Sequence, residues 1–318
     1  MSKKTLTILC PVYNEEEVIE TFYTELQSVL SSLSTDYESK TMFIIDRCED
    51  ATLEVLKRIA QLDNSVLLVA LSSRFGHQMS LLAGIDHCDS DIVIMMDSDL
   101  QHPPSVIPSM LEKYKEGHDI VYTIRQVSSD VSFISRISSK LFYLLVNKIS
   151  DTPIYENAAD FRLISRRVVE LFQHDIRERN LFLRGLFSWV GFKRTGVSFQ
   201  ANERHAGKSK YSLIQLIHFS LNGLIAFSSS VLRMAIILGV IFALLGILLG
   251  VITLVQYFFN DAFPPGWATL TILLSVYGGV QLFFLGVIGE YVGATYIEVK
   301  RRPHYIVDEK IGFNKTER

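Results

Sequence analysis

One stretch, residues 92–104, constrains the fold of this chain more than any other. An unbroken apolar run there ends in Asp97 and Asp99, and two prolines follow. Such a run predicts a strand buried on both faces, as in the centre of a parallel sheet. The two acids would then emerge at its carboxyl end, where open α/β sheets bind ligands. Acids this close repel each other unless hydrogen bonds or a cation, such as a divalent ion carrying phosphate oxygens, compensates. A solvated turn after a strand is the simpler alternative.

The residues before this run alternate between two kinds of pattern. Apolar runs typical of strands occupy residues 6–13, 42–46 and 66–71, with helical patterns at 14–33 and 79–87. Strands alternating with helices at this spacing predict βαβ units and a mostly parallel sheet. Asn14 is suited to cap the first helix. Neither a Gly-x-Gly-x-x-Gly nor a Walker-type loop is present, which disfavours dinucleotide oxidoreductases and P-loop NTPases.

The composition describes a mosaic chain. Its 318 residues leave room for one large domain or two medium ones. Apolar residues make up 48% of the chain, and their excess lies toward the C-terminus. A net charge of −3 argues against a general nucleic-acid binder, so no nucleic-acid partner is expected. The three cysteines are scattered, which fits a reducing compartment. No paired spacing places His77, His102 or His205 in a metal site.

Two uncharged segments, 234–255 and 267–288, are each long enough to span the roughly 30 Å hydrocarbon core of a bilayer. The amphipathic segment 213–227 precedes them and predicts an interfacial helix. Arg233 comes before the first span and three basic residues, 300–302, follow the second, whereas the connecting loop has no Lys or Arg. The positive-inside rule therefore predicts a multi-pass protein of the cell inner (plasma) membrane, with both termini cytoplasmic.

The expected organisation follows from these segments. It comprises an α/β domain over 1–212, an interfacial helix over 213–230, two transmembrane helices over 231–291 and a cytoplasmic basic tail over 292–318. Gly-x-x-x-Gly spacings at Gly246 and Gly289 allow close helix contacts, either within the hairpin or between copies in a homo-oligomer.

Motifs in a fixed order give this chain a family resemblance. They are Pro11-Val12-Tyr13-Asn14-Glu15-Glu16, the acidic turn 45–50, Arg74-Phe75-Gly76-His77-Gln78 and the segment from Asp97 to Pro104. Together they resemble the GT-A glycosyltransferases of family 2, and more narrowly the polyprenyl-phosphate (bactoprenol or dolichyl) glycosyltransferases. The resemblance implies a Rossmann-like GT-A domain, a nucleotide-sugar donor, and Mg²⁺ or Mn²⁺ on Asp97 and Asp99. The nucleotide-sugar residues that it implies are Pro11, Tyr13, Asn14, Glu16, Asp46, Gly76, Gln78, Asp97, Ser98 and Asp99.

One turn departs from the family pattern. Relatives usually have Asp-Asp-Gly where this chain has Ile45-Asp46-Arg47. The first acid and the glycine are missing, which leaves the identity of the nucleobase open. The departure does not touch Asp97 or Asp99.

Asp160 opens an Asp-Phe-Arg-Leu segment that resembles the family's catalytic stretch. The resemblance implies that Asp160 occupies the base position of inverting members. A phosphate acceptor is already ionised at neutral pH, so Asp160 would position the acceptor or stabilise oxocarbenium charge rather than remove a proton. A helix N-cap is the alternative reading.

Basic residues are expected to contact phosphates of the acceptor and the donor. By resemblance they are Arg125, Arg162, Arg204, Lys208, Lys210 and, as a hydroxyl partner, Ser209. For Arg125, a solvated surface arginine is the alternative. The segment 204–212 resembles a loop that closes over these phosphates, and a generic basic linker is the alternative. Residues 133–149 form a basic amphipathic pattern, which would pack on the sheet or lie in the membrane interface.

The resemblance implies an inverting enzyme that moves a hexose onto undecaprenyl or another polyprenyl phosphate at the cytoplasmic face. UDP-glucose is the first choice of donor; GDP-mannose, UDP-GlcNAc and UDP-4-formamido-arabinose are alternatives. The expected partners are thus a nucleotide sugar, a polyprenyl phosphate lipid and the membrane. A processive polysaccharide synthase is disfavoured because no Gln-x-x-Arg-Trp motif occurs. A two-span transporter subunit is disfavoured because neither span carries a charge. A catalytically inactive membrane scaffold remains the alternative of another class.

Overall fold

The structure, a computed structural model, describes residues 3–125, 158–179, 181–200 and 266–313, together with 238–241, 244–248, 251–252 and 255. Three of the expected features lie outside the described residues: the amphipathic segment 133–149, the loop 204–212 and the interfacial helix 213–227.

The described chain is built on one mixed sheet of eight strands, in the order β7-β5-β6-β4-β1-β2-β3-β8. The strands are β1 (Lys4–Val12), β2 (Tyr37–Ile45), β3 (Val66–Leu71), β4 (Ile92–Met95), β5 (Ile120–Arg125), β6 (Ala158–Ser165), β7 (Arg194–Phe199) and β8 (Val307–Ile311). β4, β1, β2 and β3 run parallel to one another, as expected for βαβ units. β6 enters antiparallel between β4 and β5, and β8 pairs antiparallel with β3. β5 and β7 pair parallel as well. The sheet is therefore mixed, and the predicted run of adjacent parallel strands is its β4-β1-β2-β3 part.

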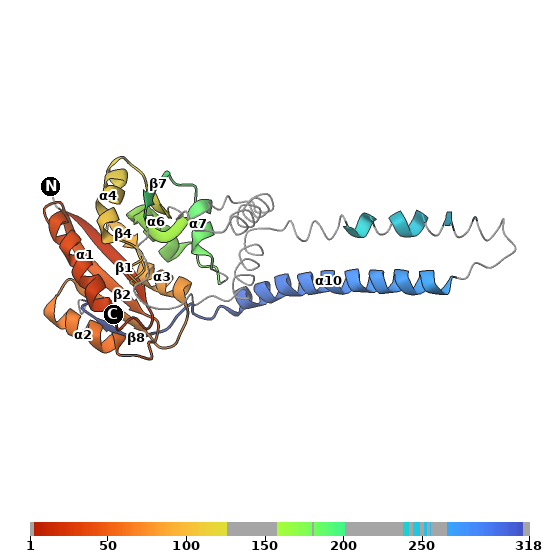
Figure 1. Ribbon diagram of the computed structural model, residues 1–318, viewed down its shortest axis with the longest axis horizontal. Helices are drawn as coiled ribbons and strands as arrows, with labels where there is room; N and C mark the ends of the chain where they lie inside the picture. Colours follow the sequence, from red (N-terminus) through yellow and green to blue (C-terminus); the bar gives the residue numbers. More distant parts are fainter. Residues whose placement is uncertain are drawn as a thin grey trace.

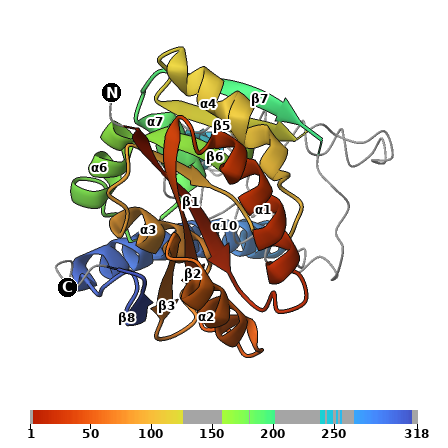
Figure 2. The ribbon, with the colours of Figure 1, turned by 90° about the vertical axis from the view of Figure 1, so that its left-hand side faces the viewer.

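Helices cover both faces of this sheet (Figures 1 and 2). They are α1 (Ile19–Leu33), α2 (Thr52–Leu62), α3 (His77–Asp86), α4 (Ile107–Lys115), α6 (Arg166–His174) and α7 (Leu183–Trp189). Successive residues of a strand point to opposite faces, so Ile8 and Leu9 of β1 belong to different clusters of buried residues. The Ile8 cluster includes side chains of α1, α2 and α4, and the Leu9 cluster those of α3, α6 and α7. The result is a three-layer α/β/α domain.

The apolar run that begins at Ile92 is the buried strand predicted from the sequence. All residues of β4 are buried, and the strand lies between β1 and β6 near the middle of the sheet. Of its two neighbours, β1 runs parallel to it and β6 antiparallel. The two acids follow directly at its carboxyl end.

The first helix begins later than expected. α1 starts at Ile19, so Asn14 is not its N-cap. Instead, Asn14 adopts a positive φ of 53°, and its side-chain oxygen accepts a hydrogen bond from the Glu49 amide at 2.9 Å. This contact turns the chain after β1 toward the loop after β2.

The C-terminal part contains one long helix, α10 (Trp267–Lys300), which projects from the sheet domain (Figure 1). Within it, Val276–Lys300 is long and apolar enough to cross a membrane, judged by length and composition. Of the first expected span, the structure describes a shorter apolar helix between Leu238 and Leu248, with gaps. The two-helix hairpin therefore remains a prediction. After α10 the chain returns to the sheet as the edge strand β8.

Candidate active site

The carboxyl ends of four parallel strands bring most of the predicted site residues to one edge of the sheet. Tyr13 and Asn14 follow β1, Asp46 follows β2, and Asp97 follows β4. β1 lies between β2 and β4, so these segments are neighbours. This edge is where open α/β sheets bind ligands.

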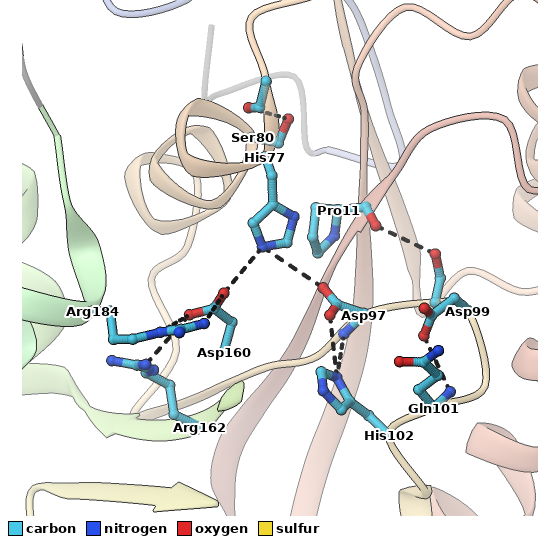
Figure 3. Close-up of polar contacts among 12 residues, drawn as sticks. Pro11, His77, Ser80, Asp97, Asp99, Gln101, His102, Asp160, Arg162 and Arg184 are labelled. Atoms are coloured by element: carbon cyan, nitrogen blue, oxygen red, sulfur yellow. Dashed lines mark hydrogen bonds and ion pairs between the residues drawn. The ribbon is translucent and has the colours of Figure 1, made fainter. Parts of the chain in front are cut away.

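Asp97 sits where β4 ends, with its side chain about one-third exposed. Its amide donates to Nδ1 of His102 at 3.0 Å, and this histidine is buried with its ring stacked on Phe161. The Asp97 carboxylate lies 3.6 Å from the same Nδ1 and 3.7 Å from Nε2 of His77 (Figure 3). His102 thus holds the backbone of Asp97 in place, and the carboxylate faces His77.

The two residues after Asp97 have different surroundings. Ser98 is buried, and its hydroxyl donates to the Pro11 carbonyl at 3.3 Å, which ties the ends of β4 and β1 together. The carboxylate of Asp99 accepts the Gln101 amide at 3.1 Å across a turn in which Leu100 has a φ of 63°. Ser98 therefore stabilises the backbone at the base of the site, while the carboxylates of Asp97 and Asp99 remain at its surface.

Asp97 and Asp99 supply hard oxygen donors of the kind that Mg²⁺ and Mn²⁺ prefer. Within the described ranges, no group of three or more His, Cys, Asp or Glu side chains is placed to hold a metal ion. A divalent ion on this pair would therefore take its remaining ligands from water or phosphate. That donor set fits a metal that arrives with a nucleotide.

Asp160 lies in β6, the strand beside β4, and its side chain is 18% exposed. It is not a helix N-cap, because the next helix starts at Arg166. Arg184 donates to both carboxylate oxygens, from Nε at 3.3 Å and Nη2 at 3.0 Å. Nη2 of Arg162 lies 3.5 Å from Oδ1, and Nε2 of His77 lies 3.7 Å from Oδ2.

These neighbours decide the charge of Asp160. Burial alone would raise the pKa of its carboxyl, but the charges of Arg184, Arg162 and His77 outweigh burial and hold the pKa well below its usual range. An ionised carboxylate with such a low pKa is a weak proton acceptor. It is suited to stabilising positive charge or to positioning a neighbouring group.

Arg162 is placed differently from the expectation of a phosphate contact. It is buried, and its guanidinium lies over the Phe187 ring at 4.6 Å. Burial lowers the pKa of this guanidinium to about 10, against the opposing effect of Asp160. The geometry makes Arg162 a partner of Asp160, and its contact with phosphate remains a prediction.

Two functional candidates were missed by sequence reasoning. Arg184 is the charged residue within the otherwise apolar stretch 181–187, and that isolation was the available signal. His77 lies inside a quoted motif but was not assigned a role. Figure 3 shows its imidazole between Asp97 and Asp160.

The loop that carries His77 is fixed by Asp46. This buried carboxylate accepts the amides of Phe75 at 2.7 Å and Gly76 at 2.9 Å. Gly76 has a φ of 91°, a conformation that favours glycine, and α3 begins at the next residue. Asp46 and Gly76 therefore set the start of α3, and their predicted contact with the nucleotide sugar remains untested by this geometry.

Arg47, which stands where the family pattern has glycine, has a positive φ and a contact of its own. Arg47 adopts a φ of 39°, in the left-handed region where relatives have glycine. Its guanidinium donates to the Ser72 carbonyl at 2.6 Å. The side chain thus joins the loops after β2 and β3, which the family glycine could not do.

The remaining predicted nucleotide-sugar residues lie on the same loops. The Tyr13 ring lies 4.0 Å under the Arg74 guanidinium. Glu16 accepts the Ala51 amide at 2.8 Å, and Gln78 accepts the Leu183 amide at 3.1 Å. Each residue thus has a partner within the protein, and its contact with a nucleotide sugar remains a prediction.

The predicted phosphate contacts are only partly described. Arg125 is exposed at the end of β5. Four further predicted residues, Arg204, Lys208, Ser209 and Lys210, lie outside the described part of the chain.

Comparison with known proteins agrees with this architecture. Residues 7–172 match the family described as Glycosyl transferase family 2. The chain belongs to this family. It is therefore a glycosyltransferase, which confirms that it is an enzyme of the transferase class.

Relatives extend the similarity beyond the matched domain. The "Uncharacterized glycosyltransferase YkcC" of Bacillus subtilis is 37% identical, over 96% of this chain and 94% of its own. The "Bactoprenol glucosyl transferase" of Shigella phage SfII is 38% identical, over 95% and 97%. Among solved structures, the chain is similar to glucosyl-3-phosphoglycerate synthase from Mycobacterium tuberculosis, which was crystallised with Mn²⁺, UDP-glucose and phosphoglyceric acid. The two are 16% identical, with a TM-score of 0.43 over 69% of this chain and 76% of that chain. The two relatives match nearly the whole chain, including its apolar C-terminal part.

Proposed function

We propose that this glycosyltransferase moves a hexose from a nucleotide sugar to polyprenyl phosphate, with inversion of the anomeric configuration. The name of the Shigella phage relative supports a bactoprenol acceptor and glucose as the first choice of sugar, from UDP-glucose. The observation that carries the proposal is the placement of Asp97 and Asp160 on adjacent strands, facing each other across His77. The Asp97 carboxylate is thereby available to the nucleotide-sugar donor, and the Asp160 carboxylate to the acceptor side.

On the donor side, Asp97 and Asp99 would hold Mg²⁺ or Mn²⁺ together with the diphosphate of the nucleotide sugar. Such an ion, when bound, supplies positive charge that offsets the negative charge of the diphosphate. The loops after β1, β2 and β3 would line the nucleoside, with Tyr13, Asn14, Glu16 and Asp46 among their residues. Gly76 and Gln78 continue this lining into α3.

On the acceptor side, the phosphate oxygen of the lipid attacks the anomeric carbon from the face opposite the diphosphate. The bond from that carbon to the diphosphate oxygen breaks, and the bonding electrons leave with the nucleoside diphosphate. No proton has to move, because the attacking phosphate is already ionised. The low pKa of Asp160 suits this reaction, since a permanently charged carboxylate can stabilise the positive charge that develops on the sugar. Arg125, Arg204, Lys208, Ser209 and Lys210 would bind the phosphates.

The C-terminal part would hold the enzyme at the membrane. We place the catalytic domain at 1–212, the interfacial helix at 213–230, two transmembrane helices at 231–291 and the tail at 292–318. α10 contains the second of these spans, and both termini would lie in the cytoplasm. This arrangement brings the catalytic domain to the leaflet that carries the lipid phosphate.

The test is transfer of radiolabelled sugar to a lipid-extractable product by the purified full-length chain in detergent, with undecaprenyl phosphate. UDP-glucose is supplied first, and GDP-mannose and UDP-GlcNAc in parallel. Labelled lipid from UDP-glucose is expected, with loss of activity on chelation and recovery with Mg²⁺ or Mn²⁺. Activity with another donor alone would correct the sugar, and no labelled lipid with any donor would contradict the proposed acceptor.

Substitutions of Asp97 and Asp99 test the donor side of the site. Asp97→Asn and Asp99→Asn should weaken Mn²⁺ binding measured in the presence of UDP, as well as activity. Asp89→Asn is a matched control, because this exposed acid follows α3 and lies before β4. The anomeric configuration of the product, read by NMR, decides whether the reaction inverts.

A further inference from the structure

We infer that His77 is a further catalytic residue, which donates its Nε2–H to the diphosphate as that group leaves the sugar. The inference rests on the proposed function and gives a role to a residue of the Arg74–Gln78 motif that had none. It is carried by the position of the His77 imidazole relative to Asp97, Asp160 and the start of α3 (Figure 3).

The imidazole occupies the space between the two carboxylates. Nε2 lies 3.7 Å from Oδ1 of Asp97 and 3.7 Å from Oδ2 of Asp160. Ionised carboxylate oxygens are acceptors only, so their position beside Nε2 favours the tautomer with its proton on that nitrogen. At 3.7 Å neither contact is a hydrogen bond. Nε2 therefore faces both carboxylates without a hydrogen bond to either, so an oxygen atom of a bound substrate can accept its N–H.

The position of His77 in its helix favours an anion as the partner of this N–H. His77 is the first residue of α3, a helix of 10 residues, and the helix N-terminus carries partial positive charge. The Gly76 carbonyl accepts the amides of Met79 and Ser80. A phosphate oxygen is thus a better partner for this N–H than a sugar hydroxyl. Of the two phosphates, the leaving diphosphate is the one beside Asp97.

The backbone that carries His77 is also held in place. Asp46 fixes the Phe75 and Gly76 amides, and Gly84 lets α3 pack closely against Leu9 of β1. About one-third of the His77 side chain is exposed, so a substrate can reach it. A donor carried by a backbone that is held before the substrate binds needs little reorganisation to stabilise developing charge.

The chemistry requires a hydrogen bond and no proton transfer. Negative charge on the diphosphate grows as its bond to the anomeric carbon breaks. A fixed N–H directed at that oxygen becomes a stronger hydrogen bond in the transition state than in the bound substrate. The effect of His77 should therefore fall on kcat rather than on the KM for the donor.

The test compares three variants of the full-length enzyme in detergent. His77→Leu removes the donor, and His77→Gln keeps an N–H at a similar reach. His174→Gln is the control, because that exposed histidine ends α6 away from the site. For each variant, kcat and the KM values for donor and lipid are measured, together with the thermal unfolding midpoint and Mn²⁺ binding in the presence of UDP.

We expect His77→Leu to lower kcat about 100-fold, the effect of losing one fixed donor to a developing oxyanion, with little change in either KM. His77→Gln should recover at least a tenth of the parental kcat, and the unfolding midpoint should stay the same. Full activity of His77→Leu, or a raised KM with unchanged kcat, would overturn the inference while leaving the proposed function standing. A fall in the unfolding midpoint with no rescue by Gln would assign His77 a structural role. If the parent protein is inactive with every donor, the proposed function fails, and this inference with it.

Discussion

Tyr305 donates its hydroxyl to the carboxylate of Asp86 at 2.8 Å, joining residues that are 219 positions apart. Asp86 ends α3 and also accepts two hydrogen bonds from Arg177, at 2.6 and 3.0 Å. Burial, reinforced by the charge of Asp86, raises the pKa of Tyr305 far above its usual value, so the hydroxyl remains a donor. The segment between α10 and β8 is thereby docked on the helix whose first residue is His77.

Replacing Tyr305 with Phe tests this docking. The change removes one donor from Asp86 and keeps the ring, so the free energy of unfolding should fall by about 1 kcal/mol. Denaturant unfolding of the detergent-solubilised protein measures it. Tyr296→Phe is the control, because the Tyr296 side chain lies 60% exposed on α10. Equal stability of Tyr305→Phe and the parent would show that the hydroxyl contributes nothing.

Removal of residues 304–318 should have a larger effect than the Tyr305 substitution. It deletes β8 and leaves the edge of β3 without its antiparallel partner. The truncated protein should unfold at a lower denaturant concentration and aggregate more readily, as measured by light scattering. Unchanged stability and solubility would mean that β8 is dispensable.

Gly84 sets the distance between α3 and β1. A Cβ at this position would lie 2.3 Å from Cδ1 of Leu9, which is fully buried. Gly84→Ala should therefore push the helix outward and destabilise the protein by about 1 to 3 kcal/mol. Activity should fall as well, since α3 carries His77. The measurements are denaturant unfolding and kcat.

A second substitution separates this steric clash from other effects. Leu9→Ala makes room for the new methyl group, so the double variant Gly84→Ala/Leu9→Ala should lose less stability than the two single losses added together. Strict additivity would show that the clash with Leu9 is not the cause.

Asp46→Asn tests the loop that precedes His77. The carboxylate accepts two backbone amides, whereas an Asn side chain has one acceptor oxygen. One buried amide, of Phe75 or Gly76, would lose its partner, which costs about 1 to 3 kcal/mol. We expect lower stability together with a lower kcat, because the start of α3 is loosened. Glu49→Gln, at an exposed acid of the same turn, is the comparison for a loss of charge alone. An equal effect on kcat would contradict a specific role of Asp46.

The sequence predicted those parts of the fold that local pattern determines. The apolar run at 92–95 became β4, and the alternation of strands and helices gave the parallel half of the sheet. β6 and β8 could not be placed, because their partners are distant in the sequence and their direction depends on tertiary packing. β8 belongs to a tail that follows the long apolar helix, and nothing in its five residues points to β3.

The candidate site, like the fold, was only partly predictable from the sequence. Asp97, Asp99 and Asp160 could be predicted as site residues because they lie in short motifs. Their neighbours His77 and Arg184 come from α3 and α7, and only the packed structure brings them to Asp160. Ser98, Glu16 and Asp46 were expected on the nucleotide sugar, yet each contacts the protein backbone. A sequence motif shows that such residues matter without showing whether they touch substrate or hold the loops that do.

Asp160 gives the prediction with the clearest dependence on pH. Its pKa is lower in the folded protein than in the unfolded chain, so the ionised carboxylate stabilises the fold. That contribution is fully present above the ordinary aspartate pKa of about 3.9 and is lost as the pH falls from there toward the lowered folded value. Between pH 5 and 8, therefore, titration of Asp160 should change neither stability nor activity.

Asp160→Asn should be less stable than the parent by about 3 kcal/mol at pH 7, because it leaves buried Arg162 without a counter-charge. The deficit should stay constant from pH 8 to pH 5 and shrink below about pH 4, where protonation of Asp160 weakens the parent as well. Denaturant unfolding at pH 7, 5 and 3.5 measures it, with exposed Asp175→Asn as the control. Activity should be strongly reduced at every pH, since the charge near the sugar is gone. A deficit that already shrinks between pH 7 and 5 would mean that Asp160 titrates near neutrality, and it would then be a proton acceptor rather than a fixed charge.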